Sequence, residues 1–512
     1  MDGSWGLSSR SCGVLTFVDT SLTMMQLALM LMPEPKNIRF GGGVADSVFN
    51  PAVLLAVMIA GACVCLSSRK RALVAFLVAG ILIPTDQVLV LGGIHLTMLR
   101  VLVLCGVTRM ARTKLSTKQM IIPGGFKRID WAVVVFAIFA ALDGILLYRA
   151  SSAIVFQFGQ LLDVLGVYLL MRHLIRDAQD VVRALRVLAY VTAVVALVMS
   201  IEQLTGRNPY AILGGANAGW YDTVQVRDGK LRATGCFAHP IIAGSYGAMV
   251  LPMFAGLWWT NRKNRTTAAI GLVGAAVIAF ASNSSTSFLG LGAGLIALCL
   301  WPLRDRMRPV RWGIALLLVS LHIVMKAPVW QLIARVDITG GSSSDHRYQI
   351  LNQCILHFWD WALIGTKDYA SWGWGLWDLG NQYVFVADTA GLIPLIAFLS
   401  IIVLGFKYIG RTRLASRCDR KQQLFAWALG ASLFANVVAF FGISYFDQII
   451  VAWYGLLAMI TGVAVRPKKR ITTVAEVSND ILPMKLDVAI ASPSPPLERV
   501  GTRDLPQSRE PW

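Results

Sequence analysis

Residues 131–148 read WAVVVFAIFAALDGILLY, a run of apolar residues in which Asp143 is the only charged side chain. A helix rises 1.5 Å per residue, so about 20 apolar residues cross the roughly 30 Å hydrocarbon core of a bilayer, and about 17 are the lower limit. This stretch therefore predicts one membrane-spanning helix. Comparable runs recur along the 512 residues, so the same prediction extends to most of the chain.

The composition agrees with a chain that spans the membrane many times. Hydrophobic residues make up 56% of the sequence and charged residues 15%, whereas soluble domains carry about 25% charged residues. A cytosolic enzyme is therefore excluded. The sequence predicts an all-α polytopic membrane protein with about 12–14 transmembrane helices and a large outward loop that carries a short helix. We expect the spans near residues 13–32, 50–66, 72–91, 94–108, 131–148, 152–171, 181–201, 239–259, 266–282, 286–302, 311–327, 390–409, 423–442 and 446–465.

Residues 72–108 are the least regular part of this pattern, because Pro84, Asp86, His95 and Arg100 interrupt the apolar runs. Two short helices, a re-entrant pair or one broken span would all suit such a sequence, since irregular backbone at membrane depth must be covered by protein. The number of spans depends on which of the three forms.

The Lys and Arg residues predict the orientation of the chain. They exceed Asp and Glu by a formal charge of +19, and they cluster in short connections between apolar runs rather than on one surface, which argues against a nucleic-acid partner. Alternate connections hold thirty of these residues on one side and ten on the other. Because cytoplasmic loops are rich in Lys and Arg, we expect both chain ends in the cytoplasm and two long loops, 203–238 and 328–389, on the outer side.

This topology divides the chain into five parts. We expect N-terminal membrane spans in 1–130, a membrane core with the outward loop 203–238 in 131–327, and the large outward loop in 328–389. The C-terminal spans follow in 390–466. Residues 467–512 are polar and contain Pro-Ser-Pro-Pro, which predicts a disordered cytoplasmic tail.

Metal and cofactor chemistry lacks a sequence signal. The eight Cys and six His residues form no CxxC pair and no HExxH, and a phosphate-binding GxxxxGK[ST] loop is also missing. We therefore expect no metal site and no cofactor, and we look for function in the two long outward loops.

Each outward loop contains an arginine in a setting that favours an anion. Arg232 precedes the apolar run that starts near His239, where its planar guanidinium suits bidentate binding of phosphate oxygens. Arg347 follows Ser342–Asp345 and would lie in the first turn of a helix that reaches Trp361, where free backbone N–H groups attract anions. The alternatives are an arginine that extends to lipid phosphate and a solvated charge on an interfacial helix.

The remainder of the large loop combines aromatic and hydrogen-bonding side chains. Flat rings can stack on sugar faces and polar side chains can bind sugar hydroxyls, although Trp and Tyr also gather at membrane interfaces. The candidate rings are Trp372, Trp374, Trp377 and Tyr383, and the candidate polar residues are Asp378, Asn381 and Gln382.

Two further features have a structural and a functional interpretation. Asp143, Asp163 and Arg100 lie within predicted spans, where we favour a structural Asp–Arg pair over the proton relay of a transporter. The stretch Ser282–Ser287 joins two spans, and we expect it to cap the helix that starts near Thr286.

The order of these features resembles the O-antigen ligase-like family of bacterial membrane glycosyltransferases and polysaccharide polymerases. The first loop ends in Arg-x-x-Gly-x-Phe-x-x-Pro. A Ser/Thr-rich turn follows, and then a large outward loop with Arg and Asn before a helix that starts Gly-Leu-Ile, so that the resemblance covers roughly residues 180–410. The residues that carry the resemblance are Arg232, Gly235, Phe237, Pro240, Ser282 to Ser287, Arg347, Gly365, Asn381 and Gly391.

The resemblance implies an enzyme of the bacterial inner membrane. Its large periplasmic loop would cap a cavity. Its donor would be a glycan linked to a polyprenyl diphosphate such as undecaprenyl diphosphate, and Arg232 and Arg347 would hold the diphosphate. Membrane lipids would be partners, and a chain-length regulator is a further candidate partner. The expected function is exopolysaccharide or O-antigen polymerisation. One alternative is an O-antigen ligase that transfers the glycan to a lipid A core, and the other is a non-enzymatic transporter of polysaccharide or solute.

One residue departs from the family pattern. The family's ligases have His-Asn where this chain has Gly380-Asn381, and that histidine is the usual candidate to assist the acceptor hydroxyl. Asp378 and His346 are the catalytic candidates that replace it, with Asp345 and Asp388 as further carboxylates. The missing histidine favours a polymerase over a ligase.

Overall fold

A computed structural model describes residues 46–84, 86–92, 94–117, 120–122, 124–214, 225–227, 229–332, 343–373, 375–376 and 378–464. All of them belong to the first of two units, Met1–Arg466. The predicted span 13–32 and the predicted tail 467–512 lie outside the described residues.

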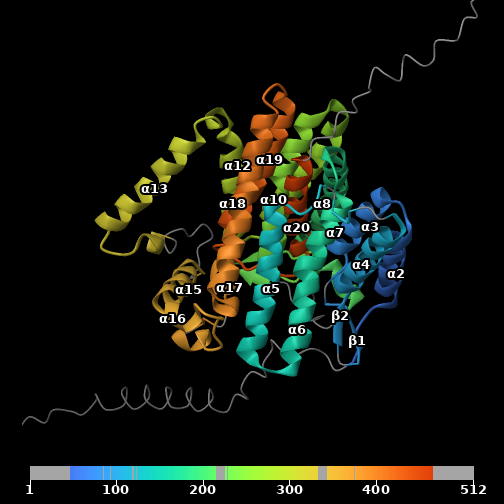
Figure 1. Cartoon of the computed structure of the whole chain (residues 1–512), viewed down its shortest axis with the longest axis horizontal. Coiled ribbons are helices and arrows are strands. Elements are labelled where there is room, and N and C mark those ends of the chain that lie inside the picture. The colour runs from blue at the N-terminus through green and yellow to red at the C-terminus, as the bar shows by residue number, and fades with distance from the viewer. Residues whose placement is uncertain are drawn as a thin grey trace, which may run out of the picture. The chain divides into compact units, whose positions relative to one another are not determined.

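The described chain is mainly helical, as the sequence predicts (Figure 1). By length and composition, eight of its helical segments can cross a membrane: α5 (Arg128–Tyr148), the segment Ser151–Leu174, α8 (Ala178–Thr205), α10 (Pro240–Thr260), Arg262–Ala281, α13 (Met307–Val324), α18 (Leu392–Ala415) and α19 (Arg420–Ala439). Shorter apolar helices are α2 (Pro51–Leu66), α12 (Ser285–Cys299) and α20 (Ile449–Val463). These helices are the pattern expected of a multi-pass membrane protein.

Two of the long segments are composite. Ser151–Leu174 consists of α6 (Ser151–Leu161), the π-helix η1 (Leu162–Gly166) and α7 (Val167–Leu174). Arg262–Ala281 joins the 3₁₀ helix η3 (Arg262–Asn264) to α11 (Arg265–Ala281). The other short 3₁₀ helices are η2 (Pro209–Leu213), η4 (Trp301–Leu303), η5 (Val329–Gln331) and η6 (Tyr369–Trp372).

Helix α10 lies in the interior of the bundle, against α11, α12 and α19. Pro240 occupies its first turn, where a missing N–H costs nothing, and His239 caps it by accepting a hydrogen bond from the Ile241 N–H. A Cβ at Gly247 would lie 2.7 Å from the Ala275 carbonyl oxygen, so glycine permits the close approach of α10 and α11.

The structure corrects the predicted spans 72–91 and 94–108. Helix α3 (Arg69–Leu82) ends before Pro84, and the strands β1 (Val88–Leu91) and β2 (Ile94–Thr97) form an antiparallel hairpin that leads into α4 (Met98–Thr117). Proline disfavours helical conformation in the residue before it, and two apolar runs around Gly92-Gly93 are a hairpin pattern. The length of an apolar run alone does not distinguish such strands from a helix.

The Asp–Arg pair predicted within the spans is present. The Arg100 guanidinium binds the Asp163 carboxylate at 2.7 Å, and Gly159 makes room for it, since a Cβ at that position would lie 2.5 Å from Arg100 Cζ. Asp163 lies in the π-helix η1. The pair therefore joins α4 to the α6–α7 segment.

The large loop between α13 and α18 contains more helix than predicted. Helix α15 (Ser343–Leu356) begins before Tyr348 and ends before His357, and α16 (Phe358–Trp361) and α17 (Gln382–Ala390) follow. The predicted helix starts close to the start of α15, but its predicted continuation to Trp361 is wrong. A break at His357 lets its ring stack on Trp372 at 4.5 Å between centroids, and lets Trp361 donate its ring N–H to the Cys354 carbonyl.

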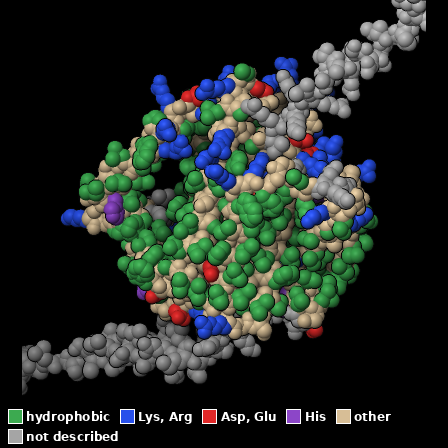
Figure 2. Space-filling model, in the orientation of Figure 1, with side chains coloured by type: hydrophobic (Ala, Val, Ile, Leu, Met, Phe, Trp, Pro, Cys, Tyr) green, Lys and Arg blue, Asp and Glu red, His purple; other side chains and the backbone are tan. Residues whose placement is uncertain are grey.

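The large loop lies at one end of the bundle. Figure 1 shows α15, α16 and α17 at the same end as the β1–β2 hairpin and the α5–α6 turn, and the Lys367 ammonium lies over the Tyr148 ring at the end of α5. Figure 2 shows hydrophobic side chains over the middle of the bundle and most of the visible Lys and Arg at the opposite end.

Candidate functional site

A buried turn of serine and threonine between α11 and α12 forms the centre of the candidate site. Ser282 and the run Ser284–Ser287 are buried, although they are polar. The surrounding helices make room with glycine, because a Cβ at Gly244 would lie 2.0 Å from Ser287 Oγ and a Cβ at Gly442 would lie 2.4 Å from Thr286 Oγ1. Five hydroxyl side chains are thus buried at this turn.

Arg232 reaches this turn from the first long loop. It ends strand β4 (Lys230–Arg232), which pairs with β3 (Gln225–Arg227), and it is only 7% exposed. Its Nε donates to the Ser282 carbonyl at 3.4 Å and one terminal nitrogen to Gln225 Oε1 at 3.5 Å, while the other terminal nitrogen, Nη2, is buried without a partner. Burial, and then the nearby charge of Arg227, lower the pKa of Arg232 to about 10.

Arg172, another buried arginine of the described chain, has a carboxylate partner. Arg172 is fully buried and binds Asp130 at 2.9 Å, and Asp130 also accepts a hydrogen bond from Tyr168. Arg232 has no ion pair with a described carboxylate. A buried charge without a partner is strongly unfavourable, so the surroundings of Arg232 suit a bound anion.

Arg347 reaches the same turn from the second long loop. It is the fifth residue of α15 rather than part of the first turn, and it is 6% exposed. Its Nη2 donates to Thr286 Oγ1 at 2.9 Å. Two arginines from loops more than a hundred residues apart therefore contact one short turn, Arg232 at Ser282 and Arg347 at Thr286.

The end of α8 holds the loop that carries Arg232. The buried Glu202 carboxylate accepts the backbone N–H groups of Thr234 at 3.0 Å and Gly235 at 2.8 Å, and the Asn208 amide donates to the Gly235 carbonyl at 2.8 Å. Gly235 has φ +60, which glycine adopts without steric cost. This network fixes the backbone directly after Arg232.

His239 lies beside Arg232, just before α10. Burial and the positive charge of Arg232 lower the pKa of His239 to about 4. The ring is therefore neutral at physiological pH, which lets its Nδ1 accept the Ile241 N–H. Sequence reasoning singled out neither this histidine nor Glu202, which directly follows the predicted span 181–201.

The two catalytic candidates meet through the backbone. The His346 ring nitrogen Nε2 lies 3.2 Å from the Asp378 carbonyl oxygen, whereas the Asp378 side chain is exposed. Asp345 is exposed and binds Gln349, and Asp388 is buried. His346 directly precedes Arg347 in α15, which places its backbone next to the arginine site.

The predicted glycan-binding residues at the start of α17 mainly hold the fold. Asn381 caps α17 by accepting the Tyr383 N–H at 2.9 Å, and Gln382 Oε1 accepts the Tyr445 N–H at 2.6 Å. Tyr383 donates its hydroxyl to the Val437 carbonyl, and its ring packs against aromatic residues. Trp374 and Trp377 lie outside the described residues.

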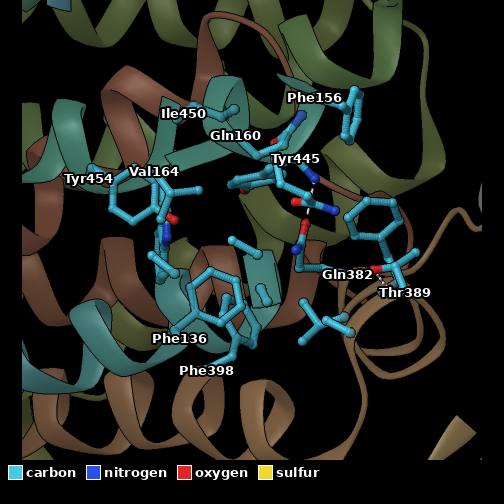
Figure 3. A pocket seen from close by; sticks show the side chains of 18 of the residues that line it. Phe136, Phe156, Gln160, Val164, Gln382, Thr389, Phe398, Tyr445, Ile450 and Tyr454 are labelled. Carbon is cyan, nitrogen blue, oxygen red and sulfur yellow. Dashed lines mark hydrogen bonds between the residues drawn. The ribbon is translucent and has the colours of Figure 1, made fainter. Parts of the chain in front are cut away.

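The turn also contacts the segment 440–447, which leads to a cavity. Thr286 donates to the Gly442 carbonyl at 3.2 Å, and the Gln382 N–H donates to the Phe440 carbonyl at 2.8 Å. Behind this segment lies a cavity of about 230 Å³ lined by residues of α5, α6, α17, α18 and α20 (Figure 3). Neither Arg232 nor Arg347 lines it.

Chemically, the turn offers an anion two guanidiniums and a row of hydroxyls. No three His, Cys, Asp or Glu side chains gather as metal ligands within the described part of the chain. No protein-family model and no curated protein matches the sequence. Function must therefore be inferred from the residues of the chain itself.

The Ser282–Ser287 turn was part of the resemblance seen in the sequence, but there we expected it only to cap a helix and not to contact both arginines. A signal was nevertheless present. Five hydroxyl residues within six positions between two apolar runs exceed the need of a single helix start, which one capping residue satisfies.

Proposed function

We propose that this chain is a multi-pass membrane glycosyltransferase of the O-antigen ligase-like type, which joins polyprenyl-diphosphate-linked glycan units on the outer face of a bacterial inner membrane. The observation that carries the proposal is the meeting of Arg232 and Arg347 at the Ser282–Ser287 turn, with Arg232 buried and without a carboxylate partner among the described residues. The diphosphate of the donor supplies the missing negative charge.

The reaction needs this charge arrangement. The acceptor hydroxyl oxygen attacks the anomeric carbon, a new glycosidic C–O bond forms, and the bond to the diphosphate breaks with its electron pair moving to the departing oxygen. Two fixed guanidiniums stabilise the negative charge that grows there, in a site from which water is largely excluded. The neutral Thr286 hydroxyl orients Arg347.

The hydroxyl proton requires an acceptor near the site, and we assign it to His346. Its Nε2 faces the Asp378 carbonyl, which as an acceptor favours the tautomer with the proton on Nε2. Nδ1 is then free to accept the proton from the acceptor hydroxyl. In this proposal the Asp378 backbone orients the ring, and its exposed carboxylate takes no direct part.

The charge distribution supports the outward placement of the site. Most of the visible Lys and Arg side chains lie at the end of the bundle away from α15–α17 (Figure 2). Cytoplasmic ends of membrane proteins are enriched in these residues. We therefore place the arginine site on the periplasmic side, where a lipid-linked donor presents its diphosphate at the level of the headgroups.

Transfer by the purified protein from a polyprenyl-diphosphate-linked repeat unit tests the proposal. Arg232→Ala and Arg347→Ala should each reduce the rate by about 100-fold or more, because each removes charge stabilisation of the leaving group. Arg207→Ala is the matched control, since Arg207 is an exposed arginine of the same loop. Wild-type rates for both site variants would refute the proposal.

The product distinguishes the polymerase from the ligase. Cells without a polymerase accumulate single repeats, whereas cells without a ligase accumulate unattached polymer. The glycine at position 380, where ligases of the family have histidine, is the residue that favours the polymerase.

A further inference from the structure

The cavity behind segment 440–447 contains no charged side chain. Its volume of about 230 Å³ exceeds that of several water molecules at roughly 30 Å³ each. Figure 3 shows Gln160 and Tyr445 on one side of it and Phe136 and Phe398 on another. The cavity is thus large enough for a ring-sized ligand and lacks the means to neutralise a charged one.

Two amide side chains lie in the wall without protein partners. Gln157 and Gln160 are three residues apart on α6, so they share one face of that helix. Both are only partly exposed, and neither side chain makes a hydrogen bond to any part of the chain that the structure describes. Gly144 makes room for one of them, because a Cβ at that position would lie 1.9 Å from Gln157 Nε2.

Aromatic rings supply the remaining surface. Trp453 and Tyr454 of α20 and Phe136 of α5 are buried and line the cavity. Ring faces and amides together match the two surfaces of a sugar, whose C–H groups stack on aromatic rings and whose hydroxyls bind amides. A purely apolar chain would leave both glutamines unmatched, and an anionic group would lie in the cavity without a counter-ion.

The cavity and the arginine site share one segment as a wall. Phe440 and Tyr445 line the cavity, and Gly442, between them in sequence, accepts the hydrogen bond from Thr286 of the Ser282–Ser287 turn. We infer that the cavity is a subsite for an uncharged sugar residue of the lipid-linked glycan. This inference rests on the proposed function and adds the chemical class of sugar that the site accepts.

Binding of three probes to the purified protein in detergent tests the inference. The probes are polyprenyl diphosphate without sugar, the same lipid with one neutral hexose, and the same lipid with one hexuronic acid. Wild-type protein should bind the hexose probe more tightly than the other two. Gln157→Leu combined with Gln160→Leu should weaken binding of the hexose probe by about 10-fold, and leave the sugar-free probe unchanged, because two hydrogen bonds are lost.

Two further variants complete the design. Gly144→Ala keeps both glutamines in the sequence but displaces the Gln157 amide, so it should selectively weaken binding of the hexose probe. This variant replaces the double variant if the latter does not fold. Gln422→Leu is the matched control, because Gln422 lies on α19 outside the cavity. This variant should bind all three probes like the wild type.

Equal effects of the glutamine variants on the hexose and sugar-free probes would overturn the inference and indicate a cavity for the isoprenoid chain. Unchanged binding of all three probes would overturn it as well. A failure of the proposed function would give a different result: the Arg232→Ala variant would then bind the sugar-free probe as tightly as the wild-type protein does.

Discussion

Arg232 and Arg172 show that the same side chain has two different uses in this molecule. Arg172 and Asp130 neutralise each other in the bundle interior, and Tyr168 completes the network. Arg232 is nearly as buried but contacts only a carbonyl and an amide among the described residues. Burial of a charge without a counter-ion is costly, so the absence of a carboxylate partner among the described residues around Arg232 points to a bound anion.

A lysine at position 232 tests whether the charge or its shape matters. The burial that lowers the pKa of Arg232 to about 10 would also lower the pKa of a lysine from its ordinary value of about 10.4. The ammonium is charged below that lowered pKa and neutral above it. Arg232→Lys should therefore transfer glycan more slowly than the wild type at every pH, because an ammonium cannot bind phosphate oxygens bidentately.

The pH dependence gives the sharper result. The ratio of the Arg232→Lys rate to the wild-type rate should fall as pH rises from about 6 to about 9, and forming the ratio removes the contribution of the general base. Arg207→Lys, at an exposed position of the same loop, should show a constant ratio. A constant ratio for Arg232→Lys would contradict a buried position in the working enzyme.

At the scale of single elements, the sequence predicted the long helices well. The predicted spans 131–148 and 239–259 correspond to α5 (Arg128–Tyr148) and α10 (Pro240–Thr260). A helix satisfies its own backbone, so a long apolar run is sufficient information. The hairpin at 88–97 depends on pairing between two short runs, and the break at His357 coincides with stacking of its ring on the distant Trp372, so local hydropathy indicates neither.

Close packing of α10 against the Ser282–Ser287 turn leads to a second prediction. Gly244→Ala places a methyl group where Ser282 Oγ and Ser287 Oγ now lie, at 2.1 and 2.0 Å from the ideal Cβ position. The turn must shift, and overpacking of this kind costs about 1–3 kcal/mol. We expect weaker donor binding and slower transfer, together with a lower thermal unfolding temperature.

Gly292 of α12 provides the matched helical glycine, because a Cβ there meets nothing within 4 Å. Gly292→Ala should leave transfer unchanged and raise stability slightly, by roughly 0.5–1 kcal/mol, since alanine is the better helix former. Equal transfer rates for Gly244→Ala and Gly292→Ala would show that the position of the turn is unimportant for the reaction.

The ion pair between α4 and the π-helix η1 allows the transporter alternative to be tested. Asp163→Ala leaves Arg100 without its carboxylate at 2.7 Å. Breaking a fully buried pair in this way costs about 3–5 kcal/mol, and we expect a smaller loss for this partly exposed pair. Replacing both partners, by Arg100→Met with Asp163→Leu, should recover most of that stability in a thermal unfolding assay. Glycan transfer by the double variant should be close to the wild-type rate.

A different outcome would favour transport. If the double variant folds with wild-type stability but has lost glycan assembly, the pair serves a proton or solute pathway rather than the helix packing. The buried Asp143, whose Oδ2 has no partner in the described chain, would then be the next residue to replace.

For the whole molecule, the sequence indicated both arginines but could not show that they meet. Their contacts with Ser282 and Thr286 join residues 50 and 61 positions apart, and only the packing of α10, α11 and α12 brings those positions together. The glutamines at 157 and 160 were missed because they lie in a run that was interpreted only as a span. The role of a polar residue inside an apolar run can be assigned only when the structure shows whether it lines a cavity.

Orientation is the prediction that belongs to the whole molecule, and cysteine labelling tests it. Cys418 lies exposed in the α18–α19 turn, at the end of the bundle rich in Lys and Arg. In a variant whose other cysteines are replaced by alanine, a membrane-impermeant maleimide should label Cys418 only after the inner membrane is permeabilised. Ala370→Cys, at an exposed position of the large loop in a background without Cys418, should be labelled without permeabilisation of the inner membrane. The reverse pattern would place the arginine site in the cytoplasm, where the enzyme would have to meet its lipid-linked donor before the glycan crosses the membrane.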